Sequence, residues 1–171
     1  DIIGTFAVHA PEDVEVHIVT GDRDELQLVD KRTKVYYTKR GITDMQIFDE
    51  AEFAANYEGL APKQLIELKG LMGDTSDNIP GVPSIGEKKG MALVQQFGNI
   101  DNLYSNIDKV ENEKMRQKLL DGKESAELSH FLATIVTDVK TFESNSEFNW
   151  NEANLQSEAF LMFLQKYEFY S

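Results

Sequence analysis

The sequence predicts a protein with an α/β part followed by a helical part. Short runs of β-branched and aromatic residues, typical of strands, occur only before about residue 73. After that residue, apolar side chains recur at the three- and four-residue spacing of amphipathic helices. A chain of 171 residues, 41% of them hydrophobic, can bury a sizeable core, so one domain, alone or with a small subdomain, is expected.

The elements of the α/β part follow from local patterns. Residues 1–10 place Ile2, Ile3 and Phe6 on one side of a helix, which Pro11 ends. Residues 14–19 are rich in valine and isoleucine and predict a buried strand. The remaining expected elements are a helical turn over 22–28, a strand over 35–38, its antiparallel partner over 44–48 and a short helix over 50–56.

Residues after 60 predict helices almost throughout. Pro62 suits the first turn of a helix over 63–72, and Gly73 ends that helix. Further helices are expected at about 86–97, 100–106, 112–120 and 124–136. The last helix is marked by an apolar series at four-residue spacing, Leu155, Ala159, Phe163 and Tyr167.

Composition narrows the possible functions. The absence of cysteine excludes disulfides and thiolate zinc sites. No apolar run approaches the roughly 18 residues of a membrane span, and no secretory signal is visible, so a reducing cytoplasm is expected. The net charge of −13 is unlike the basic surface of most DNA-binding proteins. Most of this charge is expected on a solvated surface, with a smaller share available to bind divalent cations.

Two pairs of aspartates stand at corresponding places in the predicted elements. Asp22 and Asp24 follow directly on the first strand, and Asp74 and Asp77 follow the end of the 63–72 helix. Carboxylates are ligands for Mg²⁺ and Mn²⁺, and two such ions about 3.5–4 Å apart can catalyse phosphodiester hydrolysis. Neither pair fits the spacing of an EF-hand calcium loop. The alternative is that Asp22 and Asp74 merely cap helices, and spacing alone leaves both interpretations open.

The segment between the 63–72 and 86–97 helices predicts a site for a phosphate backbone. Its glycines, Gly81 and Gly86, permit a tight turn and a close approach. The free N–H groups that begin the second helix form an anion site. Lys88 and Lys89 stand in the first helical turn, where the helix dipole disfavours cations. A phosphate bound nearby would account for two lysines at this unfavourable place. The alternative is a pair of solvated surface lysines.

Two long motifs carry a family resemblance. Residues 20–28 (TGDRDELQL) and 64–81 (QLIELKGLMGDTSDNIPG) closely resemble the 5′-3′ exonuclease domain of bacterial DNA polymerase I, a relative of the flap endonucleases. The resemblance implies a PIN-like α/β 5′ nuclease core over 1–73, with its N-terminal strands missing. A helical subdomain would follow over 74–171, with a helix-two-turn-helix DNA clamp at about 79–97.

The resemblance also implies roles for individual residues. Asp22, Asp24, Asp74 and Asp77 would bind two Mg²⁺ or Mn²⁺ ions, and Asp1 would be the last residue of an acidic Glu-Ala-Asp-Asp segment. The clamp would bind DNA, and in this family also a monovalent cation such as K⁺. Its implied DNA-binding residues are Gly81, Val82, Ser84, Gly86, Lys88 and Lys89. The chain departs from the family at Ser84, where glycine is common, and at Lys89-Gly90, where Thr-Ala is common.

The function expected from these features is structure-specific 5′-3′ exonuclease and flap endonuclease activity in DNA replication and repair. The substrates would be 5′-flap or nicked DNA, with no membrane partner, and the remaining nuclease and polymerase regions would complete the intact protein. Cleavage by this chain alone is expected to be poor or absent. One alternative is a non-catalytic fragment that binds duplex DNA through the clamp, and another is an acidic protein-interaction module.

Overall fold

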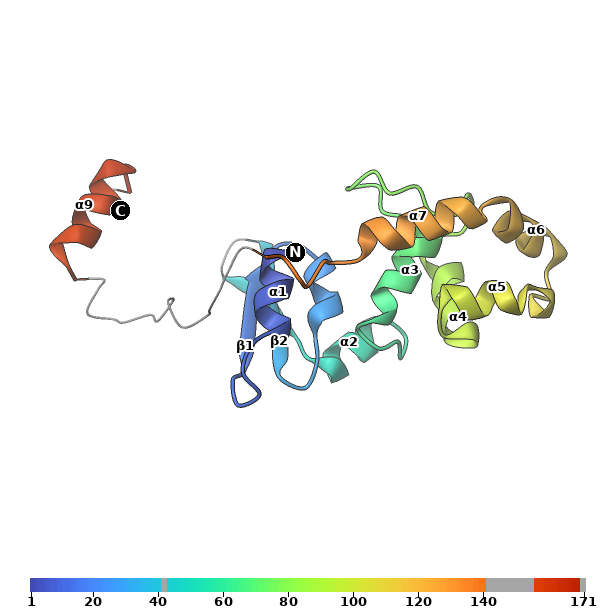
Figure 1. The fold of residues 1–171 in the computed structure, drawn as a ribbon, viewed down its shortest axis with the longest axis horizontal. Coiled ribbons are helices and arrows are strands. Elements are labelled where there is room, and N and C mark those ends of the chain that lie inside the picture. Colours follow the sequence, from blue (N-terminus) through green and yellow to red (C-terminus); the bar gives the residue numbers. More distant parts are fainter. Residues whose placement is uncertain (41–42, 141–155, 170–171) are drawn as a thin grey trace. The chain divides into compact units, whose positions relative to one another are not determined.

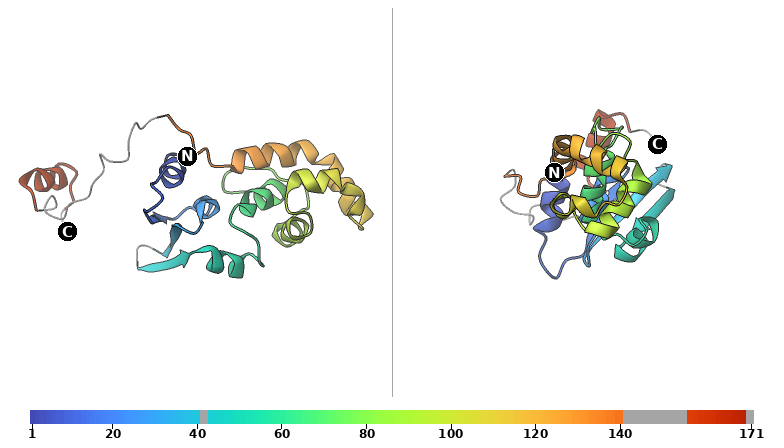
Figure 2. Two further views of the ribbon diagram at one scale, coloured as in Figure 1. Left: turned by 60° about the horizontal axis from the view of Figure 1, so that its bottom comes forward. Right: turned by 90° about the vertical axis from the view of Figure 1, so that its right-hand side faces the viewer.

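The computed structural model describes residues 1–40, 43–140 and 156–169 (Figure 1). These residues belong to two compact units, Asp1–Val139 and Lys140–Ser171, each of which is described by itself. The first unit contains a small sheet and a group of helices, and the left view of Figure 2 separates the sheet from the helices of residues 64–133. The functional division predicted after residue 73 stays a prediction.

The sheet has the order β1-β2-β3, with β1 at Val16–Thr20, β2 at Thr33–Arg40 and β3 at Asp44–Phe48. β2 and β3 are antiparallel, as the sequence predicts, whereas β1 and β2 are parallel. Ile18, Val35 and Phe48 lie in register across the three strands and are all buried, so they form the row that faces the core. The prediction that residues 14–19 are a buried strand is wrong for one face, because Val19, which points to the other face from the buried Ile18, is 62% exposed.

Short helices connect and cover the strands. α1 spans Ile2–Val8, the 3₁₀ helix η1 spans Asp24–Leu28 and α2 spans Glu50–Asn56. η1 lies in the crossover that the parallel pair β1 and β2 requires, and it carries the helical turn predicted over 22–28. α2 begins where the Asp49 carboxylate accepts a hydrogen bond from the Glu52 N–H, an N-cap that fixes its first turn.

The helices after residue 60 confirm the helical part of the prediction. Their bounds are α3 Gln64–Met72, α4 Glu87–Phe97, α5 Ile100–Ser105, the 3₁₀ helix η2 Ile107–Lys109, α6 Glu113–Asp121 and α7 Lys123–Ala133. α3 packs against α7 on one side and α4 on another, and it also contacts η1 (Figure 1). Its leucines at 65, 68 and 71 are buried, which makes α3 the centre of the helical core.

Gly90, at a position where the family commonly has alanine, lies at the contact of α4 with α3. A β-carbon at this position would lie 2.8 Å from Leu68 Cδ1, so glycine permits the close contact of α4 with α3. A glycine within a helix costs up to about 1 kcal/mol of stability relative to alanine. The close packing of α4 on α3 offsets part of this cost.

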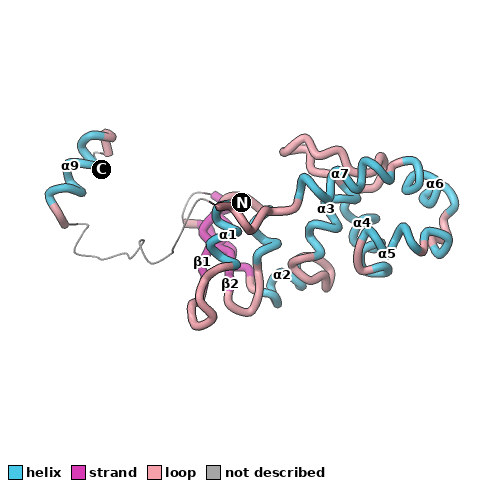
Figure 3. The backbone as a smooth tube through the Cα atoms, in the orientation of Figure 1, coloured by secondary structure: helices cyan, strands magenta, loops and turns pink. Residues whose placement is uncertain are grey.

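The second unit contains α9, Glu158–Lys166. Ser157 caps the helix by accepting a hydrogen bond from the Phe160 N–H. Of the series that predicted it, Ala159 and Phe163 lie within the helix, Tyr167 is its C-cap and Leu155 lies outside the described residues. Figure 3 colours the helices, strands and loops of the described segments, and none of those helices is long and apolar enough to cross a membrane.

Candidate metal centre and nucleic-acid interface

Three aspartates from two distant segments meet beside the sheet. Asp24 is the first residue of η1, shortly after β1 ends, and Asp74 and Asp77 lie in the turn that follows α3. Each offers a carboxylate oxygen, and these three oxygens lie within 4.8 Å of one another. Asp24 and Asp74 are partly buried and Asp77 is exposed, so the group is open on one side.

The turn that carries Asp74 and Asp77, residues 74–79, is here called the acidic turn. Asp74 and Ile79 close it through two backbone hydrogen bonds, Asp74 N–H to Ile79 O at 2.9 Å and Ile79 N–H to Asp74 O at 2.7 Å. Gly73 precedes it with a φ of +75°, and a β-carbon there would lie 2.5 Å from the Ile79 carbonyl oxygen. The local sequence therefore places both carboxylates on a closed turn at the end of α3.

Lys69 contacts two of the three aspartates 24, 74 and 77, here called the acidic group, although sequence reasoning did not assign it a role. Its side chain is 6% exposed, and its ammonium donates to Asp74 Oδ2 at 2.7 Å and also to Asp24 Oδ1. The lysine thus joins two carboxylates that are 50 residues apart in the sequence. The available signal was its position in α3, four residues after the buried Leu65 and next to the buried Leu68.

Asp74 is held in its ionised form. Burial by itself would raise the pKa of Asp74, but the hydrogen bonds from Lys69 and from the Ser76 hydroxyl and N–H outweigh it and lower the pKa to about 2. Ionised carboxylates are the form that binds a divalent cation. The formal charges of three carboxylates and one ammonium leave the acidic group with net negative charge for a cation.

The other two predicted ligands lie outside this group. Asp22 is exposed, and its Oδ1 accepts a hydrogen bond from the Asp24 N–H at 2.9 Å. The cap that the sequence left open as its alternative role is not formed, because the N-cap residue of η1 is Arg23. Asp1 is exposed, and its Oδ1 accepts from the Val136 N–H at 2.8 Å. Among the described residues, the structure thus brings three of the five predicted ligands together.

Residues 82–86, here called the clamp turn, lead from the acidic turn into α4. Val82 is buried and its N–H donates to Leu71 O at 2.8 Å, and the buried Gly81 just before it donates to Ser129. These two N–H groups are therefore used within the protein. Of the six predicted DNA-binding residues, the four that are exposed are Ser84, Gly86, Lys88 and Lys89.

The start of α4 is open to an anion. Gly86 is its N-cap residue, and no side chain caps the helix. The N–H groups of its first turn are therefore free to donate hydrogen bonds to an anion. Ser84 has a φ of +71°, a conformation that favours glycine, which accounts for the glycine common at this position in the family. The Lys89 ammonium donates to the Ser84 carbonyl oxygen at 3.1 Å and so ties the clamp turn to α4.

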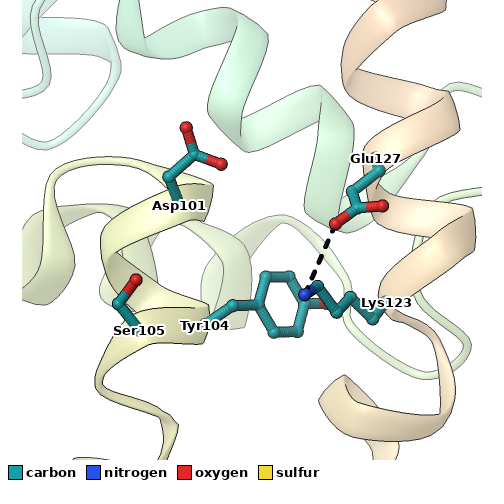
Figure 4. Close-up of a pocket in the computed structure, with 5 residues that line it drawn as sticks. All are labelled: Asp101, Tyr104, Ser105, Lys123 and Glu127. Atoms are coloured by element: carbon teal, nitrogen blue, oxygen red, sulfur yellow. Dashed lines mark ion pairs between the residues drawn. The ribbon is translucent and has the colours of Figure 1, made fainter.

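A separate pocket of about 300 Å³ lies between α5 and α7 (Figure 4). Asp101, Tyr104, Ser105, Lys123 and Glu127 line it. Lys123 is paired with Glu127 at 3.6 Å, and its ammonium lies 5.4 Å from the centre of the Tyr104 ring. Burial raises the pKa of Tyr104 to about 12, and its hydroxyl donates to Leu119 O at 3.0 Å, so these residues serve as packing and pairing partners.

Comparison with known protein families decides the relationship. The model of the 5′-3′ exonuclease N-terminal resolvase-like domain matches residues 1–58. The model of the 5′-3′ exonuclease C-terminal SAM fold matches residues 60–156, more than half of the chain. The chain belongs to the 5′-3′ exonuclease family.

Relatives of this chain occur in several bacteria. DNA polymerase I of Bacillus subtilis (strain 168) is 46% identical over 139 residues, 81% of this chain but 16% of that protein. A 5′-3′ exonuclease of Mycoplasma pneumoniae is 44% identical over 142 residues, 82% of this chain and 48% of that protein. The chain therefore spans less than half the length of either relative.

Solved structures show the same fold at lower identity. A bacteriophage T5 5′-exonuclease with bound divalent zinc ions superposes with a TM-score of 0.62 at 24% identity, covering 77% of this chain and 46% of that one. The catalytic core of Rad2 in complex with DNA superposes with a TM-score of 0.52 at 19% identity, covering 88% of this chain and 51% of that one. These neighbours confirm the predicted fold class, a PIN-like nuclease core with a small sheet and a helical part.

Proposed function

We propose that this exonuclease chain carries metal-binding and DNA-binding parts of a 5′ nuclease that hydrolyses DNA phosphodiester bonds. The observation that carries the proposal is the meeting of Asp24, Asp74 and Asp77 within 4.8 Å of one another. Relatives named as a 5′-3′ exonuclease and as DNA polymerase I support it. A bacteriophage T5 flap endonuclease solved with DNA and metal ions supports the same ligand classes.

The residues present fit a hard divalent cation. Oxygen ligands at carboxylates suit Mg²⁺ and Mn²⁺, and Asp74 stays ionised because its pKa is about 2. Three carboxylates suffice for one ion, since Mg²⁺ often keeps several waters. The proposal for a second ion uses Asp22, whose carboxylate is exposed, and Asp1 as further ligands.

Different residues of the site would serve metal binding and DNA binding during hydrolysis. A bound divalent ion supplies Lewis-acid stabilisation of the phosphoryl charge and lowers the pKa of water. Asp24, Asp74 and Asp77 would hold that ion, and Lys69 pairs with Asp24 and Asp74. The start of α4, with Ser84, Lys88 and Lys89, holds the DNA backbone without reading bases, and a K⁺ ion is proposed for the clamp turn.

The substrate proposed is DNA with a 5′ flap or a nick, as the flap endonuclease among the structural neighbours suggests. The remaining nuclease and polymerase regions of the relatives would be supplied by the intact protein. The bacterial DNA polymerases among the relatives support a cytoplasmic location.

Cleavage of a 5′-flap duplex with Mn²⁺ tests the proposal. Because the chain spans less than half of its relatives, cleavage is expected to be slow and is followed with protein in excess. Asp74→Asn and Asp77→Asn should each abolish it, whereas Asp101→Asn, an exposed aspartate of α5, should leave it unchanged. Activity that neither ligand variant alters would show that the ligands are wrongly assigned.

A second candidate function is duplex binding without catalysis. The exposed clamp turn and the uncapped start of α4 favour it, because neither needs a divalent ion. Duplex affinity measured in EDTA should fall with salt and with Lys88→Glu, while Lys114→Glu on the exposed face of α6 serves as the matched charge control. Equal losses for the two lysine variants would mean that only overall charge matters.

A further inference from the structure

Two serines of α7 hold the residue that joins the acidic turn to the clamp turn. The Gly81 N–H donates to Ser129 Oγ at 2.8 Å, and Ser125 Oγ donates to the Gly81 carbonyl oxygen at 2.6 Å. The two serines are four residues apart, so they lie on one face of α7. Both backbone polar groups of Gly81 are thus fixed by a helix more than 40 residues later in the sequence.

Gly81 cannot move without moving both turns. Its φ is +62°, and a β-carbon on it would collide with the Gly73 nitrogen, so the two glycines lie back to back. Gly73 directly precedes Asp74, and Val82 directly follows Gly81 and is bound to Leu71 O. A shift of Gly81 is therefore transmitted to the acidic turn on one side and to the start of α4 on the other.

We propose that Ser125 and Ser129 are positioning residues that set the spacing between the metal centre and the DNA-binding clamp turn. The inference rests on the proposed function, because it assigns the serines to that same site. Neither serine belongs to the group Asp24, Asp74 and Asp77 or to the predicted DNA-binding residues, so each acts through Gly81. Since one residue links both turns, an ion at the acidic turn and a duplex at the clamp turn should bind cooperatively.

The burial of the two hydroxyls predicts effects of different size. Ser129 is fully buried, so Ser129→Ala leaves the Gly81 N–H without an acceptor in a place that water does not reach. Ser125 is half-buried, so water can replace its hydroxyl in Ser125→Ala. The serine at 129 is therefore expected to matter more than the serine at 125.

The experiment measures Mn²⁺ affinity by electron paramagnetic resonance, with and without a 5′-flap duplex, on the whole 171-residue chain. The ratio of the two affinities is the coupling. Ser129→Ala should bring this ratio close to one and weaken duplex binding by up to about tenfold, because the apparent Kd rises as the competent fraction falls. Ser125→Ala should reduce the ratio less, and Ser125→Thr, which keeps the hydroxyl, should restore it. Ser105→Ala, at an exposed serine of α5, is the matched control.

The outcomes separate this inference from the proposal on which it rests. A wild-type chain that binds neither Mn²⁺ nor duplex would overturn both. Wild-type coupling that Ser129→Ala and Ser125→Ala leave unchanged would overturn the positioning role alone. If Ser129→Ala fails to fold by circular dichroism, the folded Ser125 pair decides: a lower ratio in Ser125→Ala that Ser125→Thr restores supports the role, and an unchanged ratio refutes it.

Discussion

Lys69→Met is expected to destabilise the metal-free chain strongly. The substitution keeps most of the side-chain volume but removes the ammonium that lies between Asp24 and Asp74, whose side chains are 19% and 18% exposed. Breaking a buried ion pair by removing one partner typically costs about 3–5 kcal/mol. Because Ser76 still donates to Asp74 and the acidic group is open on one side, the lower end, about 3 kcal/mol, is expected here.

Mn²⁺ should reverse much of this loss. Removing the lysine adds one unit of net negative charge to the acidic group, so the variant should bind Mn²⁺ more tightly than the wild type. Binding to the folded state alone stabilises it by about 2.7 kcal/mol at one hundred times the Kd. The two chains should therefore approach each other in stability as Mn²⁺ is added, although they differ widely in EDTA.

Urea denaturation followed by circular dichroism, in EDTA and in Mn²⁺, measures both effects. Lys114→Met, which removes an exposed lysine in the first turn of α6, is the matched control and should stay within about 0.5 kcal/mol of the wild type. Two results would refute the reasoning: a Lys69→Met chain as stable as the wild type in EDTA, or an equal gain from Mn²⁺ in both chains.

Three further predictions concern stability. The pKa of Asp74 is lowered from 3.8 to about 2, so its ionised form adds about 2 kcal/mol to the free energy of unfolding above pH 4. This contribution is lost as the pH falls through 2. In urea denaturation, the stability of Asp74→Asn should therefore fall less steeply with acid than that of the wild type. Ser84→Gly should raise stability by about 0.5–1 kcal/mol because φ at this position is +71°, and an unchanged urea midpoint would contradict this. Gly81→Ala should lower the free energy of unfolding by more than about 3 kcal/mol. Gly59→Ala, at a position with positive φ but open space around it, should lower it by about 1 kcal/mol. Equal losses would show that the close approach of Gly81 to Gly73 is unimportant.

The sequence was informative where local patterns determine structure. Asp24, Asp74 and Asp77 were candidates because each follows the end of a predicted element, and the structure places them together. Their ligand role stays a prediction. Asp22 differs because its carboxylate folds back onto the Asp24 N–H, which spacing alone cannot distinguish from a ligand.

Other features depend on contacts between distant segments, which local patterns do not reveal. From sequence alone, a lysine in an apolar helix is expected to be solvated. Only the contact of η1 with α3 shows that Lys69 is paired with Asp24 and Asp74. Likewise, Gly81 was an implied DNA-binding residue, but its N–H already donates to Ser129, which is 48 residues away in the sequence. The exposure of Val19 has a similar origin, because a strand's own sequence does not determine whether another segment covers a given face of the sheet.

The most direct test of the account is the binding of Mn²⁺ to the chain, followed by electron paramagnetic resonance. We expect the wild type to bind Mn²⁺ through the acidic group, and Asp24→Asn, Asp74→Asn and Asp77→Asn each to weaken that binding by at least about tenfold, as the loss of a charged ligand implies. Binding that all three variants retain at wild-type strength, or no binding by the wild type, would contradict the assignment of these aspartates as a metal centre.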